Sequence, residues 1–311
     1  MSADPRAEIA RQLLAAHDGV VTARELRGTG LTTNQVASLV SRGLLLRLRR
    51  DVLVDAGWWS TLSAWERHVP RASGVLRSLD PTGTGRFALS HHSALAVHGV
   101  ALYGVDPDVH LVRTTPGRGY RSTRLQVHAA VGPEHLTSAH GLPVLRPAPA
   151  VLQVAAASGI EAGLVAADHA LREQRCTRDQ LRESVTCLPL RVGRPFATVV
   201  AERTDGRHES AGESRTAWAL HLLGHRDAQP QVTIRTAQGQ FVARVDFLLG
   251  RVVIEFDGMS KYDDLSVLRS EKRREDALRS LGYQVVRITW AELADLPALR
   301  RKIGAALARA A

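Results

Sequence analysis

Carboxylates interrupt two apolar, strand-like runs near the C-terminal end of the sequence. The runs meet at a turn around Gly250; Asp246 lies in the first, and Glu255 and Asp257 lie in the second. Side chains two residues apart share one face of a strand, so the three carboxylates are expected to converge. Hard oxygen ligands of this kind suit Mg²⁺ or Mn²⁺. The pattern therefore predicts a divalent-metal site.

The strength of this prediction differs among the acidic residues. Asp246 and Glu255 lie within apolar runs, where an unpaired buried carboxylate costs several kcal/mol, which favours a functional role. Asp257 precedes Gly258, so it is either a ligand or part of an ordinary Asp-Gly turn. Glu213 either completes the metal shell or is a solvated carboxylate favoured by the start of a helix.

Lysine is rare in this chain, and two of its lysines fall in or just after the acidic segment. Of the 41 basic residues only Lys261, Lys272 and Lys302 are lysines. Lys261 is the candidate for a point charge beside an attacking water or a phosphate, and the other interpretation is a solvent-exposed loop lysine. Glu271, Arg274 and Asp276 either contact the site or DNA, or lie on a solvated, salt-bridged helix face, which is the commoner arrangement; none is expected to be catalytic.

Residues 208–296 resemble the PD-(D/E)XK nuclease superfamily, and most closely the very-short-patch-repair endonuclease-like domain at the end of many actinobacterial proteins. The resemblance implies a metal-dependent DNA endonuclease in genome defence or repair, in which Asp246, Glu255 and Glu213 hold Mg²⁺ or Mn²⁺. Asp257 stands where the superfamily usually has lysine, so either Lys261 replaces that lysine or catalysis is impaired. The matching residues are Glu213 within 210–215, Asp246, Glu255, Asp257, Gly258, Lys261 and Tyr262, then Glu271, Arg274 and Asp276, and finally the run from Gly282 through Arg287 to Trp290.

The spacing of apolar residues predicts the elements that would position this site. They are a helix over 212–223, strands over 232–235, 241–249 and 252–257, a helix over 268–281 and a strand over 284–289. This is the helix–strand–strand–strand–helix–strand order of the restriction-endonuclease core, an α/β core with a mixed sheet flanked by helices.

Residues 5–55 predict a winged helix-turn-helix. A first helix ends at 17–19, Thr22 caps a short helix, and Thr32 or Thr33 caps a third helix that is followed by two short strands with basic residues at their tip. The other interpretation is a small helical domain for protein contacts. The predicted DNA-binding residues are Asn34, Gln35, Ser38 and Arg42 in the major groove and Arg47, Arg49 and Arg50 on the wing.

This N-terminal stretch resembles the N-terminal domain of AbiEi-type abortive-infection antitoxins. The run of residues 89–99, which includes His91, His92 and His98, resembles the central α+β domain of the same proteins. The spacing of these three histidines matches no ligand pair, and we expect them to serve in packing or at the surface. Two helices, over 150–157 and 161–172, follow a break at 143–149, and 191–207 is expected to connect to the last domain.

Composition sets the remaining expectations. The chain of 311 residues is long enough for several domains. We expect a multidomain α+β protein with domains at 1–58, 59–200 and 201–311. A net charge of +10 favours polyanionic partners, although a high arginine content also arises from genomic base composition. Cys176 and Cys187 form no CxxC pair, which gives no support for a disulfide framework or a zinc site. The absence of a long apolar run predicts a cytoplasmic protein that does not cross a membrane.

These observations lead to one function and two alternatives. The first is a DNA endonuclease that a winged helix delivers to DNA. The first alternative is a non-catalytic, DNA-binding, antitoxin-like transcriptional regulator with a degenerate nuclease domain. In the second, the chain acts through protein partners such as a cognate toxin, using its helical middle.

Overall fold

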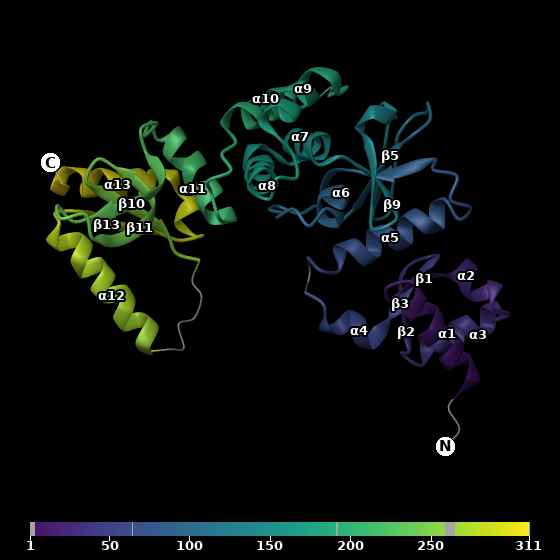
Figure 1. Cartoon of the computed structure of the whole chain (residues 1–311). Helices are drawn as coiled ribbons and strands as arrows, with labels where there is room; N and C mark the ends of the chain where they lie inside the picture. The colour runs from purple at the N-terminus through teal and green to yellow at the C-terminus, as the bar shows by residue number, and fades with distance from the viewer. Residues whose placement is uncertain (1–3, 64, 191, 259–264, 311) are drawn as a thin grey trace.

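Three separate sheets organise the part of the chain that a computed structural model describes, residues 4–63, 65–190, 192–258 and 265–310 (Figure 1). One sheet lies in each of the N-terminal, middle and C-terminal parts of the chain, and each is accompanied by helices. The predicted mixture of α and β structure is confirmed. None of the helices in the described ranges combines the length and apolar character needed to cross a bilayer.

The N-terminal region, residues 4–63, is winged-helix-like, as predicted. Thr22 and Thr32 each form a capping box at the start of a helix, because their backbone N–H groups donate to the side-chain oxygens of Glu25 and Gln35. The sheet has the order β1-β3-β2 and is antiparallel. The elements are α1 Pro5–Ala16, β1 Val20–Thr22, α2 Ala23–Gly28, α3 Thr33–Ser41, β2 Leu45–Arg49, β3 Val52–Asp55 and α4 Ala56–Thr61.

A single glycine lets the next helix approach this small sheet closely. Helix α5 (His68–Leu79) contacts β1 and β3. A Cβ placed on Gly74 would lie 2.6 Å from a methyl group of Val20 and 2.6 Å from a methyl group of Val52. Val20, Val52 and Val54 consequently belong to the same apolar core as the middle region, whereas the helix-turn-helix has a core of its own.

The middle region, residues 65–203, contains a sheet in the order β6-β7-β5-β4-β9-β8. Two sequence-based expectations were wrong here. Helix α7 begins at Pro147 inside the predicted break, because proline at the first helical position loses no intrahelical hydrogen bond. The predicted connection contains α10, which has Pro195 as its second residue. The elements are β4 Phe87–Leu89, α6 His91–Val97, β5 Val109–Arg113, β6 Tyr120–Ser122, β7 Leu125–His128, β8 Leu136–Ala139, β9 Leu142–Leu145, α7 Pro147–Ser158, α8 Ile160–Arg172, α9 Arg178–Cys187 and α10 Arg194–Arg203.

The C-terminal region, residues 204–310, follows the predicted element order. Its sheet has the order β10-β11-β12-β13, in which only the β12–β13 pair is parallel. Helices α11 and α13 contact β12, while α12 contacts β11 and β13. The elements are α11 Ala211–Leu222, β10 Gln229–Arg235, β11 Phe241–Leu249, β12 Val252–Phe256, α12 Leu265–Ser280, β13 Gln284–Ile288 and α13 Leu296–Ala310.

Buried polar contacts join the middle and C-terminal regions. Arg215 of α11, only 8% exposed, pairs with Glu161 of α8 at 2.6 Å and lies over the ring of Tyr103. The carboxylate of Asp168 on α8 lies 2.7 Å from Nδ1 of His208, which precedes α11. The domain boundaries predicted at 58 and 200 stay a prediction.

The close approach at Gly74 predicts opposite outcomes for two helical glycines. Alanine at 74 must displace Val20 and Val52, and such overpacking costs about 1–3 kcal/mol, only partly offset by the better helix propensity of alanine. We expect Gly74→Ala to lower Tm. Gly304→Ala on α13, where nothing lies within 4 Å, is the matched control and should leave Tm unchanged or raise it. Equal Tm values for the two variants would contradict the packing described for α5.

Candidate functional site

Asp246 and Glu255 face each other across two antiparallel strands. Phe247 of β11 is opposite Ile254 of β12, so the next pair outward is Asp246 and Glu255. An oxygen of the Asp246 carboxylate accepts a hydrogen bond from the backbone N–H of Phe256 at 2.8 Å. The strands open here onto a cleft of about 200 Å³. The cleft is lined by Asp246, Glu255, Phe256, Asp257, Glu271, Arg274 and Arg287.

Both carboxylates have a raised pKa in this cleft. Burial raises the pKa of Asp246 to about 6; the hydrogen bond from Phe256 opposes this change, and the charges of Glu213 and Glu255 add to it. Burial also raises the pKa of Glu255, although Arg274 and Arg287 oppose it. A cation between the two carboxylates would relieve this cost.

Arg274 supplies one such cation from α12. Its two terminal nitrogens meet the two Glu255 oxygens at 2.9 and 3.0 Å, the two-pronged geometry that makes Arg–carboxylate pairs strong. Of the two interpretations given for Arg274, contact with the acidic residues is the one that the structure shows. The sequence indicates that Glu271 and Arg274, three residues apart, share one face of a helix. It does not indicate which face of that helix packs against the sheet.

Arg287 ties the helix to the sheet beside this pair. It is the parallel register partner of Glu255 on β13. Its guanidinium lies 3.2 Å from Glu271 and 3.0 Å from Glu275. The face of α12 that carries these carboxylates is thus fixed against the strand next to the cleft.

Glu213 is buried next to the carboxylate pair, and its charge contributes to the raised pKa of Asp246. One oxygen accepts hydrogen bonds from the backbone of Glu209 at 2.9 Å and from the side-chain amide of Gln231 at 2.6 Å. Its own N–H donates to Ser210, the helix cap. The solvated alternative for this residue does not describe its environment.

The two remaining predicted residues of the site follow β12. Asp257 lines the cleft, and its backbone N–H donates to the carbonyl of Ile288 at 2.8 Å, which continues the β12–β13 contact by one residue. Lys261 lies outside the described residues. The structure thus brings Asp246, Glu255, Asp257 and Glu213 into one neighbourhood and adds Arg274.

The predicted DNA-reading residues on α3 differ in availability. Asn34 is exposed, whereas Gln35 and Ser38 are half-buried. The side-chain oxygen of Gln35 accepts the capping-box hydrogen bond from Thr32. Arg42 is exposed and forms an ion pair with Asp4, which lowers the pKa of that carboxyl. Asn34 therefore has no competing role in holding the helix.

The three wing arginines differ in their exposure and in the groups that they contact. Arg47 and Arg50 are exposed, and the Arg47 guanidinium donates to the carbonyl of Arg50 at the tip of the hairpin. Arg49 is half-buried and lies 3.5 Å from Ser122 on β6 of the middle sheet. Arg47 and Arg50 are thus the wing cations that face outward.

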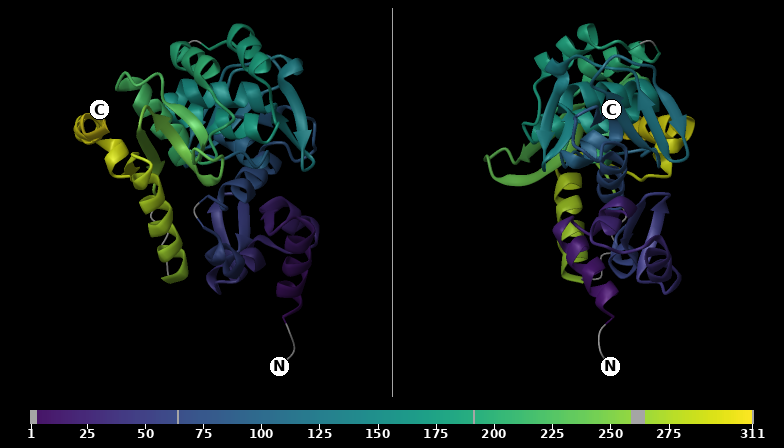
Figure 2. Two further views of the ribbon diagram at one scale, coloured as in Figure 1. Left: turned by 60° about the vertical axis from the view of Figure 1, so that its left-hand side comes forward. Right: turned by 90° about the vertical axis from the view of Figure 1, so that its right-hand side faces the viewer.

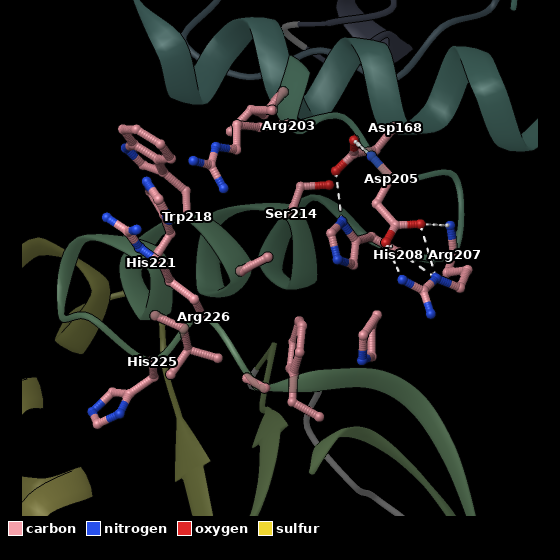
Figure 3. A pocket seen from close by; sticks show the side chains of 16 residues that line it. Asp168, Arg203, Asp205, Arg207, His208, Ser214, Trp218, His221, His225 and Arg226 are labelled. Atoms are coloured by element: carbon pink, nitrogen blue, oxygen red, sulfur yellow. Dashed lines mark hydrogen bonds and ion pairs between the residues drawn. The ribbon is translucent and has the colours of Figure 1, made fainter. Parts of the chain in front are cut away.

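A second cavity, of about 240 Å³, lies where the middle and C-terminal regions meet (Figure 3). On one side Asp168 accepts hydrogen bonds from the hydroxyl of Thr204 at 2.9 Å and from the backbone of Asp205 at 2.7 Å, besides its contact with His208. Trp218 and His221 stack on the other side. These contacts make the cavity part of the junction between the regions.

Comparison with known proteins connects the N-terminal region to a regulator family. Residues 8–54 match the family described as transcriptional regulator, AbiEi antitoxin. Two uncharacterised proteins of Mycobacterium tuberculosis, from strains CDC 1551 / Oshkosh and ATCC 25618 / H37Rv, are each 28% identical to this chain over 258 residues. The aligned segment covers 78% of this chain and 90% of each relative. The antitoxin resemblance is confirmed for the N-terminal region, and the nuclease resemblance stays a prediction.

The raised pKa of Asp246 predicts a pH-dependent stability difference. The folded chain binds this proton more tightly than the unfolded chain, so stability is lost as pH rises from about 4 through about 6. Asp246→Asn cannot ionise, and its amide oxygen can still accept from Phe256. In EDTA at pH 7.5 we expect this variant to be more stable than wild type by about 1–3 kcal/mol. Urea unfolding should show the difference vanishing near pH 4.

Asp80→Asn gives the control of opposite sign. Burial raises the pKa of Asp80, but hydrogen bonds from Thr84, Arg86 and Gly85 outweigh it and leave the pKa below its usual value. This variant should be less stable than wild type at pH 7.5, by an amount that shrinks as pH falls below about 4. An Asp246→Asn difference that does not change with pH would contradict the electrostatics described for the cleft.

Proposed function

We propose that this protein is a DNA-binding, metal-dependent endonuclease. In this proposal the N-terminal winged helix holds the DNA and the C-terminal region hydrolyses the phosphodiester bond. The observation that carries it is the meeting of Asp246 and Glu255 in one cleft, with Glu213 buried beside them. The helix–strand–strand–strand–helix–strand order around the cleft also supports a PD-(D/E)XK core.

The chemistry of the cleft fits a hard divalent cation. Asp246 and Glu255 offer oxygen ligands, and Glu213 adds negative charge nearby, which suits Mg²⁺ or Mn²⁺. When bound, the cation would activate a water and neutralise charge on the scissile phosphate. Burial, and to a smaller extent the charges of Glu213 and Glu255, raise the pKa of Asp246, and a bound cation would lower that pKa.

The residues of the chain would have separate tasks at this cleft. Asp246 and Glu255 would hold the cation, and Glu213 would keep the first turn of α11 and β10 in place through its bonds to Glu209 and Gln231. Arg274 already neutralises Glu255 and would be free to approach a phosphate when a cation takes over that task. Arg274 would then supply charge of the kind that lysine supplies in the superfamily.

The arrangement of the regions supports the coupling of binding and cleavage. In both views of Figure 2, α12 and the N-terminal region extend to the same side of the middle region. Helix α12 carries the cleft residues Glu271 and Arg274. A DNA duplex held by the winged helix would therefore lie on the side of the molecule to which α12 projects.

The second candidate is a DNA-binding, antitoxin-like regulator that does not cut DNA. Two observations favour it, the match of residues 8–54 to the AbiEi antitoxin family and the presence of Asp257 where the nuclease superfamily usually has lysine. In this case Arg274 would permanently replace the metal as the partner of Glu255. A cognate toxin would be an additional protein partner.

Cleavage of supercoiled plasmid separates the two candidates. Wild type should nick the plasmid with Mg²⁺ or Mn²⁺ and not with EDTA, and Asp246→Asn and Glu255→Gln should each lower the rate at least about a hundredfold. Glu202→Gln, which removes an exposed carboxylate from α10, is the matched control and should cut like wild type. If folded wild type binds the plasmid without cutting it, the regulator becomes the better description.

The wing predicts a specific salt dependence of DNA binding. Each arginine that contacts a phosphate adds about one to the slope of log affinity against log salt. Arg47→Ala and Arg50→Ala should each weaken binding and reduce that slope by about one, for any duplex sequence. Arg301→Ala on α13 removes the same charge from another surface and should have little effect on the slope. Equal losses in all three variants would contradict binding through the wing.

A further inference from the structure

Five buried or half-buried histidines meet in the middle region, far from the acidic cleft in sequence. They come from the first residue of α5, the start of α6 and the two parallel strands β5 and β7. His91 and His92 begin α6 and are 6% and 1% exposed, and His110 in β5 is 2% exposed. The five residues are His68, His91, His92, His110 and His128.

Three of these rings gather their nitrogens in one place. The ligand nitrogens of His91, His110 and His128 all lie within 4.8 Å of one another. Nδ1 of His110 is 3.0 Å from Nε2 of His128. The ring of His91 stacks on that of His128 at a centroid distance of 4.1 Å and lies 4.8 Å from that of His110.

The surroundings orient two of the three rings from behind. Nε2 of His110 lies 3.2 Å from a carboxylate oxygen of Asp106, in contact but not aligned as a hydrogen bond, so its other nitrogen faces His128. Nδ1 of His91 lies 3.0 Å from the hydroxyl of Ser90. Metal-bound histidines commonly have such a partner on the outer nitrogen, because it fixes the ring and its tautomer.

His91 adopts a backbone conformation that its side chain does not favour. Its φ is 49°, in the left-handed region, although it is the first residue of a helix. A non-glycine residue in this region carries strain that the surrounding structure must offset. The effect here is to place the ring of His91 against His110 and His128.

Burial favours the neutral form of these rings, which is the form that binds a metal ion. Burial lowers the pKa of His128 and of His92 to about 4, and it lowers the pKa of His91 and His110 as well. Neutral imidazole has a lone pair to donate, whereas imidazolium has none.

We propose that His91, His110 and His128 bind a divalent transition-metal ion of the Zn²⁺ class. Three imidazole nitrogens select Zn²⁺, Co²⁺, Ni²⁺ or Cu²⁺ over Mg²⁺, which prefers oxygen. Nitrogens bound to one tetrahedral Zn²⁺ at about 2.1 Å lie about 3.4 Å apart, so rotation of the rings must close the widest pair by about 1.4 Å. The fourth position remains open to water or a further ligand. His128 is half-buried and lies at the end of β7, where such a ligand could enter.

This site is independent of the acidic cleft. Its ligands are nitrogens rather than carboxylate oxygens, and they come from α6, β5 and β7 rather than β11 and β12. The proposal does not rest on nuclease activity. The two sites can therefore be tested separately in one full-length chain.

Titration with Co²⁺ tests the histidine site. The full-length protein should carry Asp246→Asn and Glu255→Gln, which remove the acidic site, and no histidine tag. One Co²⁺ per chain should bind and give the visible absorption of a nitrogen-coordinated ion, Zn²⁺ should displace it, and a large excess of Mg²⁺ should not. Saturating Zn²⁺ should also raise Tm.

Two histidines in the same backbone conformation provide a matched pair of variants. His91 and His140 both have φ of 49°, which asparagine tolerates. His91→Asn should weaken Co²⁺ binding at least about tenfold, whereas His140→Asn, at an exposed position, should bind like the parent. His128→Gln gives a second ligand variant if His91→Asn does not fold. Folded parent protein that binds no Co²⁺, or binding that His91→Asn and His128→Gln leave unchanged, would overturn the proposal.

Discussion

The placement of two carboxylates opposite each other on β11 and β12 is the constraint on which the C-terminal region depends. The register that places Phe247 against Ile254 leaves Asp246 beside Glu255, and like charges at this separation repel. Three contacts from the surrounding structure offset this repulsion. A backbone N–H holds Asp246, Arg274 holds Glu255, and Arg287 holds the carboxylates of α12 that would otherwise repel the pair. Packing of α12 on this sheet is thus as much electrostatic as apolar.

Buried contacts connect the middle region to the acidic cleft of the C-terminal region. Arg215 reaches Glu161 and also lies over the rings of Tyr103 and Trp290, and Trp290 in turn packs edge-on against Phe256 at the cleft. A chain of contacts therefore runs from α8 to the strand that carries Glu255. Because Asp168 fixes the segment that leads into α11, the position of Glu213 also depends on the middle region.

The sequence predicted a helix or strand well where the residues that define it lie close together in the chain. Thr22 and Thr32 mark helix starts through residues three positions away, and β11 matches its predicted bounds because its apolar residues alternate over nine positions. Helix α7 was misplaced because a cluster of prolines suggests a break, although proline is also favoured at a helix start. Asp246 and Glu255 could be brought together from strand periodicity alone. Arg274 and the cluster of His91, His110 and His128 could not, because their partners lie 18 or more residues away and no periodicity reports which helix face meets which strand.

The glycine at position 74 has a consequence for how this chain could be divided or recombined. The three-stranded sheet that forms the wing buries Val20, Val52 and Val54 against α5 and the middle region, so one layer of side chains serves two neighbours. A fragment ending at residue 58 would expose that layer to water. A chimaera that exchanges the N-terminal winged-helix-like region with that of a relative would therefore need its junction after α5, near residue 80. The packing unit at this end of the chain is thus longer than the segment that matches the regulator family.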